Sequence, residues 1–192
     1  MRFSGILVGL FVFGFGAGTT SQRTAYRNHE YGIVLPIPPA TLPCVPPVYA
    51  GNGTDHGPQI LLGTKDASLC SKSSGKRYVN IFASYNASDD TKTLHALLES
   101  ACESEVKRQC SPAPVDLHIR VLKSEAGRFD RSDGSIEIIV VTQAGRPDPD
   151  FDASVPSINY ELFLETDAVH LAQDLSIFRV LLKTIRIAPP SH

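Results

Sequence analysis

The sequence predicts an α+β fold in which an antiparallel β-sheet packs against helices. Three stretches in the second half of the chain alternate apolar and polar residues, as expected of strands with one buried face: 115–121, 136–141 and 160–165. The connections between them, 127–134 and 144–157, are rich in Gly, Pro and Asp and show no helical pattern. Consecutive strands that are joined without a helix are expected to pair antiparallel.

Two amphipathic helices complete this prediction. Acidic and hydroxyl residues at 89–91 suit the start of a helix, and the apolar residues of 94–101 recur at helical spacing. A second helix should begin at Asp167 or, after a looser turn, at Asp174. Its apolar stripe consists of Leu171, Leu175, Phe178, Leu182 and Ile185. Each helix therefore has one face to bury against the sheet.

The first half of the chain contributes further strands and one long loop. A hairpin is expected at 24–35, and apolar strands are expected at 59–62 and 78–85. Between them, 36–58 contains seven prolines. Proline lacks a backbone N–H, so this segment should be a loop without regular structure. The stretch 136–141 is apolar on both faces at its far end and should therefore lie centrally in the sheet.

Residues 1–21 have the layout of a secretory signal peptide, so residues 22–192 should form one exported domain. Arg2 is the only charged residue before Arg23, and an apolar and glycine-rich run spans 6–17. The alternative, an N-terminal membrane anchor, is disfavoured because a helix needs roughly 20 apolar residues to cross a bilayer. The mature protein should be secreted or periplasmic and should have no membrane span.

Charge and motifs exclude several classes of partner. The formal net charge is −2, with 18 basic and 20 acidic side chains. This balance gives no electrostatic reason to expect binding to nucleic acid or to an anionic membrane. No cofactor motif is present, so no cofactor is expected.

The four cysteines are expected to form two disulfides. Cys44, Cys70, Cys102 and Cys110 include no C-x-x-C pair, which argues against a zinc ribbon or a thioredoxin-type motif. An even number of cysteines in an exported protein favours disulfides over free thiols, which remain the alternative. Three connectivities are possible, and we favour pairing in sequence order. The first bridge would then tether the proline-rich loop.

Two short segments carry a resemblance to a known family: the opening Tyr26-Arg27-Asn28-His29-Glu30-Tyr31-Gly32-Ile33 and the final Phe178-x-x-Leu181-Leu182-x-x-Ile185-x-Ile187. They resemble the PsbP-like fold, which is shared by the extrinsic photosystem II protein P and a Ran-binding import factor. The resemblance implies an α/β/α sandwich and a non-catalytic accessory or protein-binding role. The chain departs from the family because it has no Trp and because 36–58 is an insertion of its own.

An acidic segment between the last two predicted strands is a candidate metal site. Asp148, Asp150 and Asp152 have the spacing that opens a calcium-binding loop, where alternate oxygen ligands converge on one cation. However, Ala153 replaces the glycine that makes the turn, and Asn159 replaces the bidentate glutamate. The alternative is a solvated acidic loop.

The proline-rich loop contains the candidate binding residues Tyr49, Asp55 and His56. An adjacent Asp and His can act as an orienting group and a general base. The chain has no G-x-S-x-G motif, so the signature of a serine hydrolase is absent. We therefore interpret these residues as part of a binding surface, since exposed loops on a rigid sheet commonly carry such residues.

Four other sites receive ordinary interpretations. His118 and His170 are expected to be surface or helix-cap residues, with His170 paired to Asp174. Lys76-Arg77 is interpreted as ordinary charge ahead of a strand. Asn86-Ala87-Ser88 matches a glycosylation acceptor, which matters only in a eukaryotic host.

The sequence thus predicts a non-catalytic exported accessory or protein-binding domain. Its partner would be another exported protein or a surface component, contacted through 36–58. The first alternative is a small hydrolase or metal-dependent enzyme that uses Asp55 and His56 or the acidic loop at 148–152. The second is an immunity protein of the bacterial envelope, which fits the size and export of the chain.

Overall fold

The computed structural model describes residues 25–44, 56–71, 77–86, 93–103, 110–113, 116–145 and 157–187. The described elements comprise ten strands, two α-helices and one 3-10 helix. In chain order they are β1 (Ala25–Asn28), β2 (Ile33–Pro36), β3 (Thr41–Cys44), β4 (Gln59–Leu62), η1 (Ala67–Ser71), β5 (Tyr78–Tyr85), α1 (Leu94–Glu103), β6 (Ser111–Pro112), β7 (Ser124–Asp130), β8 (Ser135–Ala144), β9 (Ile158–Asp167), α2 (Leu171–Thr184) and β10 (Arg186–Ile187).

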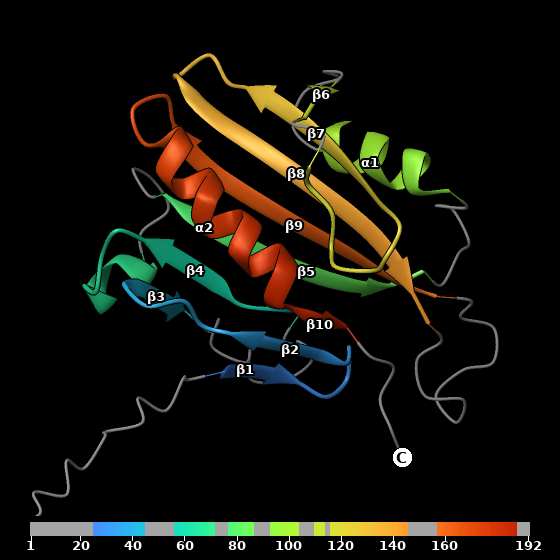
Figure 1. Ribbon diagram of the computed structural model, residues 1–192. Helices are drawn as coiled ribbons and strands as arrows, with labels where there is room; N and C mark the ends of the chain where they lie inside the picture. Colours follow the sequence, from blue (N-terminus) through green and yellow to red (C-terminus); the bar gives the residue numbers. More distant parts are fainter. Residues whose placement is uncertain are drawn as a thin grey trace, which may run out of the picture.

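The strands form two antiparallel sheets, which confirms the α+β class (Figure 1). The larger sheet has seven strands in the order β3-β4-β5-β9-β8-β7-β6. The smaller sheet has three strands, in the order β1-β2-β10. The first and the last strand of the described chain therefore both pair with β2. β8 lies between β7 and β9, inside the larger sheet, as its apolar character on both faces predicts.

The two helices pack against opposite faces of the larger sheet. Alternate residues of β8 point to opposite faces. Ile139 and Val141 pack with Leu97 of α1, whereas Ile138 and Val140 belong to the core that includes Phe178 of α2. In Figure 1, α2 crosses in front of β9 and β5, and α1 lies beside β7 and β8.

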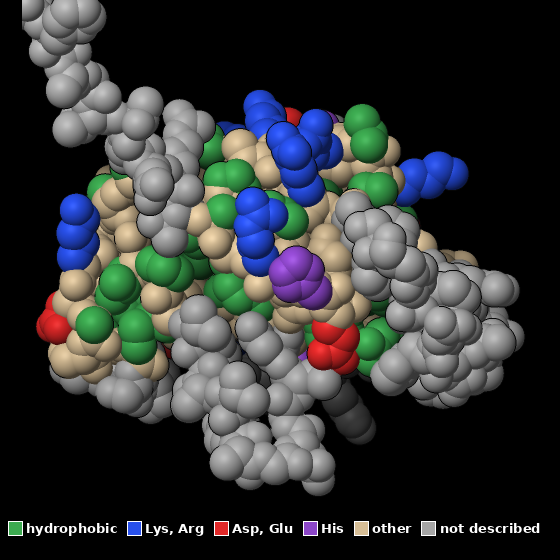
Figure 2. Space-filling model, turned by 90° about the horizontal axis from the view of Figure 1, so that it is seen from below, with side chains coloured by type: hydrophobic (Ala, Val, Ile, Leu, Met, Phe, Trp, Pro, Cys, Tyr) green, Lys and Arg blue, Asp and Glu red, His purple; other side chains and the backbone are tan. Residues whose placement is uncertain are grey.

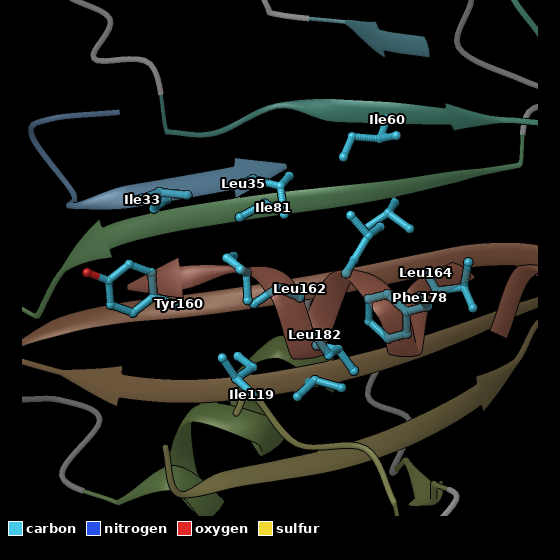
Figure 3. Packing of buried hydrophobic residues seen from close by; sticks show 14 of the residues in the cluster. Ile33, Leu35, Ile60, Ile81, Ile119, Tyr160, Leu162, Leu164, Phe178 and Leu182 are labelled. Carbon is cyan, nitrogen blue, oxygen red and sulfur yellow. The ribbon is translucent and has the colours of Figure 1, made fainter. Parts of the chain in front are cut away.

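The main core lies between the larger sheet, α2 and the smaller sheet. Figure 3 shows Ile81 of β5 and Leu162 of β9 pointing toward Leu35 of β2 and Leu182 of α2. All four side chains are fully buried or nearly so. The apolar stripe predicted for the second helix is thus the face that buries against the sheet, and helix formation and core burial stabilise each other.

Tyr31 links the opening hairpin to this core. Its side chain is almost completely buried, and its carbonyl accepts a hydrogen bond of 2.7 Å from the Tyr160 hydroxyl of β9. Its backbone N–H donates to Asn28 Oδ1, 2.9 Å away, which closes the turn between β1 and β2. The hairpin expected at 24–35 is therefore present, as β1 and β2.

The prediction of a strand at 115–121 is wrong. Within the described part, 116–123 forms no strand; Leu117 and Ile119 are buried and His118 is exposed, as the alternation predicted, but Val121 is 95% exposed. The Leu122 N–H donates to the Ile119 carbonyl, which turns the chain. An irregular segment can bury alternate side chains without any strand partner, so the pattern alone did not identify a strand.

The strand that pairs with β8 is instead β7, which occupies part of the predicted connection 127–134. Its sequence is mostly polar and small, Ser-Glu-Ala-Gly-Arg-Phe-Asp, and lacks a clear alternation. Ladder hydrogen bonds to β8 and β6 define it rather than burial. The true connection is the tight turn at 131–134, closed by hydrogen bonds between Arg131 and both Gly134 and Ser135.

The helix starts differ from expectation. α2 begins at Leu171 with His170 as N-cap and no side-chain cap bond. Asp167 accepts from the backbone N–H groups of Val169 and His170, so it stabilises the turn before the helix. Asp174 is not the N-cap, because it lies inside the first turn of α2 and is buried. α1 is capped by Thr93, whose hydroxyl accepts from Ala96 N–H; residues 89–91 lie outside the described part.

Both disulfides are present and pair in sequence order. Cys44 joins Cys70, with Cα atoms 5.5 Å apart, and Cys102 joins Cys110, with Cα atoms 5.8 Å apart. Two such bridges are typical of proteins in an oxidising, extracytoplasmic compartment. Within the described ranges, neither helix is long and apolar enough to cross a membrane.

Candidate functional site where the proline-rich loop returns

The proline-rich segment is more regular at its start than predicted. Residues 41–44 form β3, which pairs with β4, although Pro43 lies within it. The prediction that 36–58 lacks regular structure is therefore wrong at this point. β3 is one of the two edge strands of the larger sheet, and proline is tolerated on edge strands because its missing donor can face away from the neighbouring strand.

Both ends of the remaining loop are fastened to the sheet. At one end, Cys44 closes β3 and forms its disulfide with Cys70 of η1. At the other end, the His56 carbonyl accepts from Ala83 N–H at 2.8 Å and the Pro58 carbonyl accepts from Ile81 N–H at 3.1 Å. The chain thus rejoins the sheet along β5 before β4 begins.

Gly57 permits this close approach. Its φ is +142°, and a Cβ at this position would lie 2.2 Å from the Ile81 carbonyl oxygen. Backbone atoms of a central strand cannot move away cheaply, so a side chain at position 57 is excluded. The fold therefore requires glycine at position 57, the third residue of Asp55-His56-Gly57.

The His56 ring is held by a carbonyl and by aromatic rings. Nδ1 lies 2.7 Å from the Ala83 carbonyl oxygen and 3.3 Å from the Tyr31 hydroxyl. The ring stacks on Phe82, with ring centres 4.8 Å apart, and on Tyr31, with ring centres 5.6 Å apart. A carbonyl can only accept, so Nδ1 carries the proton in this arrangement.

A tyrosine and a glutamate extend this cluster. Tyr85 packs against Tyr31 with ring centres 5.1 Å apart, and its hydroxyl donates to Glu30 Oε1 at 3.0 Å. Burial, followed by the hydrogen bond to Glu30, raises the pKa of the Tyr85 hydroxyl well above its usual value. Tyr85 therefore stays protonated and remains a donor. We call Glu30, Tyr31, His56, Phe82 and Tyr85 the loop-return cluster.

This geometry makes His56 an anchor for the loop. In a catalytic histidine the group that orients Nδ1–H is commonly a carboxylate, whose charge stabilises the imidazolium that forms. Here a neutral carbonyl occupies that place. It fixes the tautomer and the ring orientation, which serves to hold the loop, and it supplies no negative charge.

Most of the candidate residues lie outside the described part of the chain. Tyr49, Asp55, Asp148, Asp150 and Asp152 belong to this group. Of the predicted binding residues, the structure places only His56. Among the described residues, no three His, Cys, Asp or Glu side chains gather closely enough to hold a metal ion.

Sequence reasoning missed a buried ion pair. Asp174 is 1% exposed, and both of its oxygens lie 3.2 Å from Nη1 of Arg77; Oδ2 also accepts from the Thr166 hydroxyl at 2.6 Å. The signal was present, because Asp174 falls three residues after Leu171 and four before Phe178, on the buried stripe of α2. The predicted pair of His170 with Asp174 is wrong.

His170 instead contacts Asp167. Its Nδ1 lies 2.9 Å from both carboxylate oxygens of that residue. This hydrogen bond is the main reason that the pKa of Asp167 lies below its usual value. His118 is exposed, as predicted. Asn86 is buried and donates to the Ser157 hydroxyl at 3.2 Å, so its side-chain amide is occluded in the folded protein.

A second missed cluster lies on the face of the larger sheet that carries α1. The Tyr78 hydroxyl donates to Glu165 Oε2 at 2.8 Å, and Arg131 contacts Glu165 and Glu137. Burial is the main cause of the raised pKa of the Tyr78 hydroxyl, and its hydrogen bond to Glu165 is a further cause. The cluster joins β5, β9 and β8 through side chains that are far apart in sequence.

No protein-family model matches the chain, and no curated protein matches it.

Proposed function

We propose that the protein is a non-catalytic exported accessory or protein-binding domain whose contact surface is the proline-rich loop at 36–58. The observation that carries the proposal is the double fastening of this loop. The Cys44–Cys70 disulfide holds one end and the loop-return cluster around His56 holds the other. Fastening both ends lowers the entropy that a loop loses when it binds, so affinity rises.

The architecture supports membership of the PsbP-like fold. Helices on opposite faces of an antiparallel sheet correspond to an α/β/α sandwich. The two segments that carry the resemblance meet in space, since β2 of the opening hairpin pairs with β10 at the end of α2. Members of that fold are mostly non-enzymatic, which favours a binding role by analogy.

Export is the second part of the proposal. Residues 1–21 would be removed as a signal peptide, and the mature domain would oxidise its four cysteines in the periplasm or outside the cell. The two disulfides support this setting. The partner would then be another exported protein or a surface component.

A pull-down from the periplasm or secretome of the source organism tests the contact surface. The mature protein and two variants serve as baits: Cys44→Ser with Cys70→Ser, and Cys102→Ser with Cys110→Ser. The second variant is the matched control, because it removes the bridge that does not fasten the loop. We expect the first variant to lose the partner and the control to keep it. Equal recovery by all three baits would show that the loop is not the contact surface.

A further inference from the structure

A groove on the surface separates the irregular segment 119–122 from β10. The residues that line it come from 119–122 and 185–187 and are either apolar or arginine. Its volume is about 160 Å³, and roughly 150 Å³ is enough for an apolar cavity to accept a benzene-sized group. The groove therefore has room for one apolar side chain.

β10 presents an open strand edge to this groove. It is the last strand of the smaller sheet, and β2 is its only strand partner among the described residues. No backbone hydrogen bond joins 119–122 to 185–187 across the groove in the described chain. An open edge offers N–H and C=O groups to an added strand, as in β-augmentation.

The rim of the groove is basic. Arg120 lines one side and Arg186 the other, and both are exposed. Lys183, also exposed, precedes Arg186 by three residues. None of the three side chains has a hydrogen-bond or ion-pair partner within the described ranges, whereas the side chain of the nearby Arg179 is paired with Asp116 at 3.0 Å. Figure 2 shows Lys and Arg side chains gathered toward the upper edge of that view, with hydrophobic side chains among them.

This local charge contrasts with the chain as a whole, which has a formal net charge of −2. Unpaired cations on both sides of an apolar groove favour an occupant that brings carboxylates on either side of an apolar side chain. Val121, 95% exposed beside the groove, adds apolar contact area.

We propose that this groove binds an extended acidic segment of a partner protein. The segment adds a strand to the open edge of β10, inserts one apolar side chain into the groove and places carboxylates against Arg120 and Arg186. No groove residue belongs to 36–58, so this surface is additional to the proline-rich loop. The binding role is shared with the function proposed above, but variants of the loop leave the groove intact, and the two proposals can fail separately.

The backbone of Arg120 supports a role for its side chain. Its φ is +44°, a left-handed conformation that favours glycine. A non-glycine residue in such a conformation is an outlier from which a functional hypothesis can start. Arg120→Gly removes the guanidinium while suiting the backbone, so it provides a binding variant that should fold.

Fluorescence anisotropy with a labelled short peptide that alternates Glu with Ile tests the proposal. A peptide with Gln in place of every Glu reports the contribution of charge. The protein variants are Arg120→Glu with Arg186→Glu, and Lys65→Glu as the control. Lys65 is exposed and does not line the groove.

We expect the acidic peptide to bind the wild type and Lys65→Glu alike. We expect binding to weaken roughly tenfold with the Gln peptide and with the double variant, since each change removes charge-assisted contacts. Circular dichroism checks the fold of each variant; if the double variant is unfolded, Arg120→Gly and Arg186→Gln replace it with the same expectation.

Three outcomes would overturn the proposal. The first is equal binding of the acidic peptide by the charge-reversed groove variant and by Lys65→Glu. The second is binding to vesicles of anionic phospholipid, lost in the groove variant, without binding to the peptide. The third is concentration-dependent self-association in sedimentation velocity that the groove variant abolishes, again without peptide binding.

Discussion

Asp174 shows how one buried charge shapes the stability of this protein. Its carboxylate is 1% exposed and is neutralised by Arg77, whose side chain is 20% exposed. Removing one partner of a fully buried pair typically costs about 3–5 kcal/mol because the other charge is left without compensation. The exposure of Arg77 lowers this value, since water can solvate the guanidinium.

We therefore expect Asp174→Asn to lower the free energy of unfolding by about 2–4 kcal/mol, measured by urea denaturation at neutral pH. Asp116→Asn is the matched control, because it breaks another Asp–Arg pair whose aspartate side chain is 61% exposed. The control should change the free energy of unfolding by less than about 1 kcal/mol. Similar losses for both variants would contradict our account of the buried pair.

Glu161 gives a prediction about pH. It lies on β9 between Phe82 of β5 and Val141 of β8, and burial raises its pKa. The folded state therefore holds its proton more tightly than the unfolded chain. The difference between the folded and unfolded pKa values of Glu161 stabilises the folded state. This stabilisation is fully present below the unfolded pKa, about 4.3, and is lost as pH rises through the folded pKa. At neutral pH the charged carboxylate is unfavourable.

Replacing Glu161 by Gln removes this charge at similar volume. We expect the midpoint of thermal unfolding to rise relative to wild type at pH 7, and this gain to shrink or vanish near pH 4, where the wild-type carboxyl is largely protonated. Glu99→Gln, at a residue that is 63% exposed on α1, serves as the control and should show no comparable gain. A gain for Glu161→Gln that is equal at both pH values would rule out the burial of its charge as the cause.

At the level of elements, α1 is joined to the sheet through its disulfide. Cys102 near the end of α1 pairs with Cys110, which lies directly against Gly127 of β7. A Cβ on Gly127 would come within 2.8 Å of the Cys110 Cβ and 3.0 Å of its sulfur. The absence of a side chain at 127 therefore lets the bridge lie on the sheet.

We expect Gly127→Ala to cost about 1–3 kcal/mol of stability by overpacking. In the Cys102→Ser, Cys110→Ser background the cost should fall, because the segment around position 110 can then move. Gly134→Ala is the control: its φ is +87° and no atom lies near the added Cβ, so its cost reflects backbone strain alone. A double-mutant cycle measures both. An unchanged cost of Gly127→Ala without the disulfide would contradict this coupling.

The packing of individual elements also explains why the prediction of a strand at 115–121 was wrong. Buried Leu117 and Ile119 produced an alternation in a segment that has no strand partner, while β7, at 124–130, carries small and polar residues. Strand identity depends on ladder hydrogen bonds to a neighbour, and these leave no trace in the local sequence of a strand with little buried apolar surface. β5, β8 and β9 bury whole rows of apolar side chains, so their patterns were reliable.

At the level of the whole molecule, the two sheets and α2 enclose one continuous core that extends from the opening hairpin to β10. The first described strand and the last lie in the same small sheet, on either side of β2. This closure brings β10 beside 119–122 and so creates the groove. It also brings Tyr31 to His56 and β5, so the loop returns onto the hairpin that opens the described fold.

The sequence by itself determined the α+β class, both helices and the long interior strands, and it favoured the pairing of the cysteines in order. These features follow from local periodicity, from composition and from short separations along the chain. Of the candidate site, it identified His56 but not its partners. Only the tertiary structure decided the position of β7, the edge strand inside the proline-rich segment, the Arg77–Asp174 pair and the groove beside β10. Each of these depends on groups that are distant in sequence and meet because the core must exclude water and every strand must find hydrogen-bond partners.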